Sequence, residues 1–275
     1  MFKQTVHRIK TVIGLMRVFG VREASNIIWD RLAQKRRVEK RIIVPACVSE
    51  LKCDFCLSSN WVDCCTFLEV IVHKEYKLSE NLNRLIDGKP IIDIGANIGA
   101  AAVYFANSYP NSPILAIEPH PRNVDFIREN SAPYSDSVTV IEKAFSVNPG
   151  TVTLANPEVE VKQQHNSYLF STNLACESED AIRVRSITPE EILSISQFSK
   201  EIGLLKVDIE GAEKEIFESP QIDQLLSITD VLAIETHDRL IPGCTNAVMD
   251  AAKRNGLKLF KQKGDVLFFT RLKSI

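Results

Sequence analysis

The stretch Asp93-Ile94-Gly95-Ala96-Asn97-Ile98-Gly99 decides the fold class. It follows the apolar run 90–94, which is typical of a short buried strand, and leads into a helical pattern over 98–109. Glycine at 95 and 99 lets the backbone turn sharply and approach a ligand, and the start of a helix offers unpaired N–H groups. A strand, a glycine-containing loop and a helix in this order indicate the ligand edge of a doubly wound α/β sheet.

Beyond this loop, apolar strand patterns keep alternating with helical ones. Further strands are expected at 113–118, 138–142, 151–154, 204–208 and 231–235, and further helices at 121–130, 212–218 and 246–255. The polar stretch 156–180 is expected to be an insertion or a lid, and the turn around Gly264 predicts a terminal hairpin. Strands that alternate with helices form a mostly parallel sheet with helices on both faces. We therefore predict one α/β domain over residues 90–275.

The residues before this domain have a different pattern. Residues 1–41 alternate apolar and basic residues at helical spacing, and 42–89 hold short apolar runs between turn signals, which predicts a helix followed by a β-rich lead-in. Residues 1–41 contain 11 Lys or Arg against 3 acidic residues, whereas the rest of the chain contains 22 against 32. We expect the basic helix to cap the main domain or to contact an anionic membrane or an acidic partner. Nucleic acid is disfavoured as a partner, because the body is acidic.

The composition is that of an ordinary globular protein, with 275 residues, 45% hydrophobic and 25% charged. There is no apolar run of 18 residues and no apolar signal segment at the start, so we expect a cytoplasmic protein, peripheral at the inner face of the membrane if 1–41 binds lipid. The seven cysteines are an odd number, which indicates free thiols. Cys53-x-x-Cys56 followed by Cys64-Cys65 lacks the second two-residue spacing of a zinc knuckle, so we assign no zinc site there.

The residues around the loop narrow the class of ligand. The dinucleotide fingerprint G-x-G-x-x-G requires glycine where Asn97 stands, so a pyrophosphate would meet a side chain. Asp93 lies just before the loop, where its carboxylate suits an ammonium group. Glu118 ends the next strand, 19 residues after Gly99, where an acid accepts hydrogen bonds from the ribose hydroxyls of NAD or of S-adenosylmethionine. A cationic amino-acid ligand suits this loop better than a diphosphate.

A second charged motif follows a later strand, at Lys206-Val207-Asp208-Ile209-Glu210-Gly211-Ala212-Glu213. Lys206 and Asp208 are two residues apart and share one face of the strand, with Asp208 at its carboxyl end beside the Asp93 loop. Such charges at the end of an apolar strand are costly unless they are paired or solvated. They line the ligand edge in one interpretation, and in the other Lys206 makes a purely structural ion pair.

Glu235-Thr236-His237 ends the following strand and places two more polar side chains near Asp208. An imidazole beside a carboxylate is a suitable general base near neutral pH, which makes Asp208, Glu235 and His237 the candidate catalytic residues. Two carboxylates and an imidazole could equally hold a divalent metal, although the spacing does not demand one and we assign none. An idle surface histidine is the third interpretation.

Together these residues resemble the FkbM-type S-adenosylmethionine-dependent methyltransferases. The resemblance covers 90–270 and rests on D-I-G-A-N-I-G at 93–99, E-P-H-P at 118–121, Asn130, A-F-S at 144–146, K-V-D-I-E-G-A-E at 206–213, and Glu235 with His237. It implies a Rossmann-like class I methyltransferase sheet, mostly parallel with a terminal antiparallel hairpin strand, flanked by helices and preceded by a helical and β-rich extension. It also implies S-adenosylmethionine as the cofactor and methyl transfer to a hydroxyl of a sugar, polysaccharide or natural product.

The resemblance assigns roles residue by residue. Asp93, Gly95, Asn97 and Gly99 would line the methionine part of the cofactor, Glu118 the ribose, and Pro119 with Glu142 and Ala144 of a later turn the adenine. Asp208, Glu235 and His237 would face a small-molecule or glycan acceptor. His237, oriented by Glu235, or else Asp208, would receive the hydroxyl proton.

Two alternatives to methyl transfer stay open. An NAD(P)-dependent sugar-nucleotide oxidoreductase or epimerase would need a loop that accepts pyrophosphate and usually a Tyr-x-x-x-Lys pair, and none of the five tyrosines has Lys four positions on. A non-catalytic module would bind the cofactor without turnover.

Overall fold

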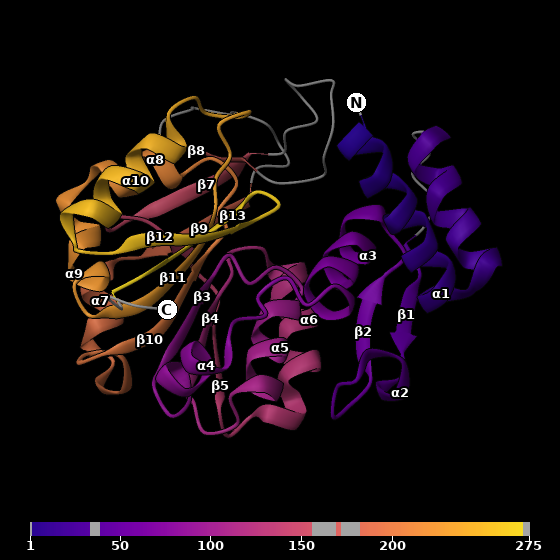
Figure 1. Cartoon of the computed structure of the whole chain (residues 1–275), viewed down its shortest axis with the longest axis horizontal. Coiled ribbons are helices and arrows are strands. Elements are labelled where there is room, and N and C mark those ends of the chain that lie inside the picture. The colour runs from indigo at the N-terminus through magenta and orange to yellow at the C-terminus, as the bar shows by residue number, and fades with distance from the viewer. Residues whose placement is uncertain (1, 34–38, 156–168, 172–181, 272–275) are drawn as a thin grey trace. The chain divides into compact units, whose positions relative to one another are not determined.

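The computed structural model describes residues 2–33, 39–155, 169–171 and 182–271 (Figure 1). The chain folds as two compact units, Met1–Lys77 and Leu78–Ile275. The predicted three-part division into 1–41, 42–89 and 90–275 stays a prediction.

The larger unit is built on a seven-stranded sheet with the order β12-β13-β11-β10-β3-β4-β5. Its strands are β3 (Ile91–Ile94), β4 (Ile114–Ile117), β5 (Val138–Ile141), β10 (Ile202–Val207), β11 (Thr229–Glu235), β12 (Lys258–Lys263) and β13 (Val266–Thr270). The strands β3, β4, β5, β10 and β11 are parallel, while β13 is antiparallel to both β11 and β12. The predicted mostly parallel sheet with a terminal hairpin is therefore confirmed.

Helices lie on both faces of this sheet. They are α4 (Glu80–Ile86), α5 (Ala100–Ser108), α6 (Pro121–Ser131), α7 (Pro189–Ser194), α8 (Glu213–Glu218), α9 (Asp223–Leu226) and α10 (Cys244–Arg254), with short 3₁₀ turns at Ala132–Tyr134, Ser196–Phe198 and Pro220–Ile222. On one face, α5 packs on β3 and β4, and α4 packs on β10 and β11. On the other face, strand residues such as Ile92 and Leu205 form a core with Phe217 of α8 and Val248 of α10. Coverage of both faces explains why the parallel strands are mostly apolar.

Local sequence sets where two of these helices begin. Pro121 occupies the first turn of α6, and the His120 side chain accepts a hydrogen bond from the Arg122 N–H at 3.2 Å. At α7, Thr188 and Glu191 form a capping box, in which each side chain accepts a hydrogen bond from the other residue's N–H.

A second sheet of the larger unit has the order β6-β9-β7-β8. Its strands are β6 (Ala144–Phe145), β7 (Thr151–Ala155), β8 (Leu169–Ser171) and β9 (Ile182–Ile187). Of the insertion or lid predicted at 156–180, the structure describes 169–171, which pair with β7 as an antiparallel strand. The other residues of that prediction lie outside the described part of the chain.

The smaller unit contains more helix than the sequence suggested. Its elements are α1 (Phe2–Ala33), β1 (Arg41–Val44), α2 (Ala46–Ser49), β2 (Phe55–Ser58), α3 (Trp61–Phe67) and a π-helical turn at Leu68–Val72. The N-terminal helix is confirmed, with a break at Gly20, where φ is 78° and ψ is 160°. The β-rich lead-in is wrong for the apolar run 67–72, which is helical. The Asn60 side chain accepts a hydrogen bond from the Asp63 N–H and so starts α3, which continues into the π turn.

The structure also bears on the expectations about the cysteines and about membrane-spanning segments. The six cysteines within the described ranges are free thiols, as predicted, and Cys176 lies outside those ranges. None of the described helices combines the length and the apolar character that a membrane span requires.

Candidate active site

The site lies where the order of the large sheet reverses. From β3 the chain proceeds outward through β4 and β5 on one side, while β10 and β11 lie on the other side. The carboxyl ends of β3 and β10 are neighbours, and Asp93 on β3 is in register with Lys206 on β10. Doubly wound sheets bind ligands at this switch point.

The loop after β3 touches the loop after β10 through its backbone. Gly95 has φ of 75°, and a Cβ atom there would lie 1.8 Å from the carbonyl oxygen of Asp208. The Gly95 N–H donates to the Ile117 carbonyl at 2.9 Å, and the Asp208 N–H donates to the Ile94 carbonyl at 3.0 Å. Only glycine fits at 95, because of both the space and the left-handed backbone.

The same loop continues through two more left-handed residues into α5. Asn97 has φ of 49°, and Gly99, with φ of 84°, is the N-cap of the helix and brings no side chain to it. The buried Asn130 side chain donates to the Ile98 carbonyl at 3.0 Å and so fixes the end of the loop. A helix start without a capping side chain is suited to a ligand.

Glu118 joins this loop to the end of β4. Its side chain is buried and accepts hydrogen bonds from the N–H of Asn97 at 2.9 Å, the N–H of His120 at 3.0 Å and the Asn123 amide at 3.2 Å. Burial raises the pKa of Glu118 to about 7, although these hydrogen bonds act in the opposite direction. An ionised carboxylate accepts about four hydrogen bonds, so one acceptor position remains for a ligand. Both hydroxyls of a ribose would fit only if the Asn123 amide turned away.

Asp93 and Lys206 form a buried ion pair behind the loop. The Lys206 Nζ lies 3.0 Å from Asp93 Oδ1 and donates a hydrogen bond to the Gly95 carbonyl at 2.6 Å. Burial raises the pKa of the fully buried Asp93, against the opposing effect of the Lys206 charge. Burial alone would lower the pKa of Lys206, but the charges of Asp93 and Asp208 raise it. The structural ion pair is therefore present, and direct contact of Asp93 with a ligand stays a prediction.

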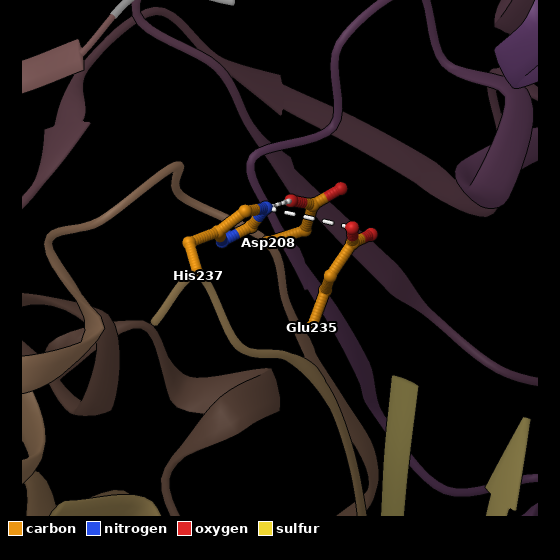
Figure 2. Close-up of side chains that lie close together, drawn as sticks. All are labelled: Asp208, Glu235 and His237. Atoms are coloured by element: carbon orange, nitrogen blue, oxygen red, sulfur yellow. Dashed lines mark ion pairs between the residues drawn. The ribbon is translucent and has the colours of Figure 1, made fainter. Parts of the chain in front are cut away.

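Asp208, Glu235 and His237 come together beside this pair (Figure 2). Asp208 directly follows β10, Glu235 ends β11, and one ligand atom from each of the three side chains lies within 4.8 Å of the others. The His237 Nε2 is 3.8 Å from Asp208 Oδ1 and 3.5 Å from Glu235 Oε1, and Glu210 Oε2 is also close, at 3.3 Å. Their spatial proximity was predicted from the sequence, and their roles stay predictions.

The residue that orients His237 is not the predicted one. The His237 Nδ1 lies 2.7 Å from Oε1 of Glu213, which is fully buried at the start of α8. Glu213 is held in turn by the Gly211 N–H at 2.9 Å. Glu213, and not Glu235, therefore fixes the ring. The sequence contained Glu213 in the second charged motif, but no spacing rule linked it to a histidine 24 positions later.

The charges of this cluster shift its titration. Burial alone would lower the pKa of His237, but the hydrogen bond with Glu213 and the carboxylates of Glu235, Glu210 and Asp208 raise it to about 11. Burial, with the charge of Asp208, raises the pKa of Glu210 to about 7, and burial with the charge of Glu235 raises that of Asp208. The carboxylates around the ring therefore favour its protonated form.

The three residues predicted to contact the adenine differ in their burial and in their contacts. Pro119 is buried next to Glu118, and the Glu118 N–H donates to the Ile141 carbonyl at 3.1 Å, so the turn after β5 begins beside it. Glu142 in that turn is exposed and contacts Arg128 at 3.3 Å. Ala144 is fully buried among residues of the second sheet. The adenine roles of Pro119, Glu142 and Ala144 stay predictions.

A stretch of sequence that includes both loops of the site matches a known family. Residues 93–243, more than half of the chain, match the family model described as the Methyltransferase FkbM domain. The chain belongs to the FkbM methyltransferase family. S-adenosylmethionine, the cofactor implied by the resemblance, is confirmed by this membership. The predicted class I methyltransferase fold is confirmed by the family and by the seven-stranded sheet described above.

Individual relatives of this FkbM methyltransferase are distant. It is 24% identical over 189 residues to Methyltransferase 1 of Beauveria bassiana, covering 62% of this chain and 75% of that protein. It is 30% identical over 155 residues to Methyltransferase sdnD of Sordaria araneosa, covering 46% of this chain and 58% of that protein. Among solved structures, the fibrillarin of Aeropyrum pernix with natively bound S-adenosyl-L-methionine shares 11% identity with a TM-score of 0.40, covering 68% of each chain.

The residues of the β3 and β4 ends fit the cofactor of an FkbM methyltransferase. Gly95 and Gly99 bring no side chains to the two ends of the loop, and Glu118 keeps one acceptor position. These are the features that a ribose and a charged methionine part require.

Proposed function

We propose that the chain transfers a methyl group from S-adenosylmethionine to a hydroxyl of a small-molecule or glycan acceptor, such as a sugar, a polysaccharide or a natural product. The observation that carries the proposal is that the Gly95 loop and the cluster of Asp208, Glu235 and His237 occupy adjacent strand ends. When bound, S-adenosylmethionine supplies a methyl group already activated by its sulfonium charge. The protein then needs to align the acceptor oxygen and to take its proton.

The exposure of the cluster favours Asp208 over His237 as the group that receives this proton. The side chain of His237 is 2% exposed, whereas that of Asp208 is 27% exposed at the end of β10. The charge of His237, whose Nε2 is 3.8 Å from Asp208 Oδ1, favours the ionised form of the Asp208 carboxylate. Glu235, 26% exposed, lies where it can contact the acceptor.

Calorimetric titration with S-adenosylmethionine, S-adenosylhomocysteine and NAD tests the donor half of the proposal. Both adenosyl ligands should bind, NAD should not, and Glu118→Ala should weaken the binding of both. Binding of NAD alone would instead favour a sugar-nucleotide oxidoreductase or epimerase. A screen of hydroxylated glycans and natural products then tests the acceptor half, in which cofactor binding without turnover on any acceptor would favour a non-catalytic module.

We also propose a peripheral contact of α1 with an anionic membrane, at its cytoplasmic face. Among the described side chains of α1, five large apolar ones are exposed, with exposed fractions from 39% to 74%: Ile13, Met16, Val21, Trp29 and Leu32. The exposed basic residues Lys10, Arg17 and Arg22 lie on the same helix. Exposed apolar side chains beside basic ones are typical of helices that bind anionic lipid.

Co-sedimentation with vesicles containing phosphatidylserine tests this contact. Binding should weaken with added salt and in the double variant Trp29→Ser with Leu32→Ser, while far-UV circular dichroism stays unchanged. Equal binding to neutral vesicles, or binding that the double variant retains, would contradict the proposal.

A further inference from the structure

We propose that Asp208, Glu235 and His237 bind a divalent cation of the Mn²⁺ or Mg²⁺ class at the acceptor side of the site. The cation site is separate from the cofactor loop and is formed by the ends of β10 and β11. Its ligands would be one oxygen from each carboxylate and the Nε2 of His237 (Figure 2).

The spacing of the three ligand atoms suits one ion. Ligands at about 2.1 Å from a shared cation lie roughly 3.0 to 3.4 Å apart when adjacent and about 4.2 Å apart when opposite. The Nε2 of His237 is 3.8 Å from Asp208 Oδ1 and 3.5 Å from Glu235 Oε1, and all three atoms lie within 4.8 Å of one another. Small side-chain rotations therefore bring them to a common cation. The Nε2 contacts are also longer than N–H···O hydrogen bonds of about 2.7 to 3.2 Å, so the nitrogen faces the carboxylates without being bound tightly by them.

Glu213 gives this histidine the environment of a metal ligand. A metal-bound imidazole generally donates its other N–H to a carboxylate, which fixes the ring orientation. The fully buried Glu213 lies 2.7 Å from Nδ1 and leaves Nε2 directed into the cluster, and the ring is almost fully buried. This is an observation independent of the number of acidic residues, because it concerns the second nitrogen of the ring.

Two buried oxygens of the cluster are also without a donor. Asp208 Oδ1 and Glu210 Oε2 are inaccessible and accept no hydrogen bond from the described residues. Both oxygens face the His237 Nε2, at 3.8 and 3.3 Å, so a positive charge at this position, either a proton on Nε2 or a metal cation in its place, offsets the cost of burying them. Glu210 itself has a left-handed backbone, with φ of 51°, which places its carboxylate 3.3 Å from the same nitrogen. A residue held in a sparsely populated conformation beside a candidate site is consistent with a functional constraint.

The chemistry of the donors selects the class of cation. Carboxylate oxygens favour Mg²⁺ and Mn²⁺, and one imidazole among them shifts the preference toward Mn²⁺. The nearby thiol of Cys244 contacts the Gly211 carbonyl at 4.0 Å and is not in the ligand group, which disfavours soft metals. A cation here would lower the pKa of an acceptor hydroxyl and so ease the loss of its proton. That consequence rests on the proposed function, whereas binding of the cation does not.

Titration of the full-length chain with Mn²⁺, followed by the electron paramagnetic resonance signal of the free ion, tests the proposal. We expect one Mn²⁺ per chain, with binding weakened at least tenfold in Asp208→Asn and Glu235→Gln, and about 10- to 100-fold in Glu213→Gln, which alters only the support of the ring. Asp250→Asn, an exposed carboxylate on α10, is the matched control and should bind as the wild type does.

The outcomes separate the cation site from the proposed function. No binding of Mn²⁺ or Mg²⁺ at millimolar concentration, or binding that all the cluster variants retain, would overturn the cation site. If a variant fails to fold, the wild-type stoichiometry still decides, together with the rise in melting temperature that Mn²⁺ should give the wild type. S-adenosylmethionine binding is measured on the same samples. A wild-type chain that binds S-adenosylmethionine but no Mn²⁺ would contradict this inference alone and leave the proposed function standing.

Discussion

The two sides of the site differ in which groups form them, backbone on one side and charged side chains on the other. At the ends of β3 and β4, the site is mostly backbone, with Gly95 and Asn97 in left-handed conformations and one carboxylate, Glu118, held largely by main-chain N–H groups. At the ends of β10 and β11, it is mostly charged side chains gathered around His237. The first side is specified by consecutive residues, and the second by residues that only the fold brings together. The cofactor side should therefore respond to changes in backbone shape, and the acceptor side to changes in charge.

The largest effect is expected on the acceptor side, from Asp208→Asn. Loss of the group that receives the proton should lower turnover by about 10²- to 10⁴-fold. The dissociation constant of S-adenosylmethionine should change by less than about twofold, because the amide keeps the shape of the loop next to Gly95. Steady-state rates and calorimetry on the same protein check both parts. A loss of cofactor binding as large as the loss of turnover would contradict the assignment of Asp208 to the acceptor side.

The second-largest effect is expected from a backbone change on the cofactor side, and two glycine variants measure it. Gly88 and Gly95 both have positive φ, of 83° and 75°, but a Cβ at 88 meets nothing within 4 Å, whereas one at 95 meets the Asp208 carbonyl. Gly88→Ala should cost only the backbone strain of about 1 to 2 kcal/mol. Gly95→Ala should destabilise the chain by roughly 3 kcal/mol or more, because backbone atoms have to move as well. The free energy of unfolding of each variant is measured in urea. Equal losses in Gly88→Ala and Gly95→Ala would contradict the close approach of residue 95 to the Asp208 carbonyl.

A charge change on the cofactor side should be smaller. Glu118→Gln replaces an acceptor by an amide that faces the N–H groups of Asn97 and His120, which removes hydrogen bonds to a charged group. We expect S-adenosylmethionine affinity to fall by roughly 10- to 100-fold, or about 1.4 to 2.7 kcal/mol. Glu129→Gln, an exposed carboxylate on α6, is the control. Unchanged affinity in Glu118→Gln would remove Glu118 from the ribose site.

The smallest predicted effect is a pH dependence of cofactor binding. The pKa of Glu118 is raised to about 7, so the carboxylate becomes protonated, and loses an acceptor for the ribose, as the pH falls below 7. Affinity should therefore decrease from pH 8 to pH 6, by up to about tenfold per unit once the pH is below the pKa. Calorimetry at several pH values on wild type and Glu118→Gln isolates this contribution, since titration of the ligand itself affects both proteins. Parallel curves for the two proteins would contradict it.

Local sequence was sufficient for the parallel strands of the large sheet and for the strand, loop and helix on the cofactor side. The apolar runs that became β3, β4, β5, β10 and β11 are short and bounded, and a parallel sheet covered on both faces produces that pattern. The run 67–72 has the same composition, with Val70, Ile71 and Val72, yet it is helical. The residue that decides is Asn60, whose side-chain cap starts the helix upstream of the apolar run. Composition of the run alone could not reveal a start signal outside it.

On the acceptor side, the sequence identified the participants but not their pairing. The side chains of Asp208, Glu235 and His237 were expected to meet, because neighbouring parallel strands end at one edge. The partner of His237, however, depends on where α8 begins, and Glu213 reaches the ring only because it lies in the first turn of that helix. The ion pair of Asp93 with Lys206 likewise depends on register across two strands, which a single sequence does not encode in any local pattern.

The contact between Gly95 and the Asp208 carbonyl has a consequence for engineering. Because the backbone at 95 leaves no space for a Cβ, the loop that begins with Asp208 cannot be shifted or lengthened without displacing the cofactor loop. Libraries aimed at a new acceptor should therefore leave the backbone of 208–211 unchanged and diversify positions such as Thr236 and Arg239, which lie beyond the end of β11. In a redesign, side chains that contact the acceptor can be changed without affecting the cofactor loop, but the backbones of these two loops cannot be changed independently of each other.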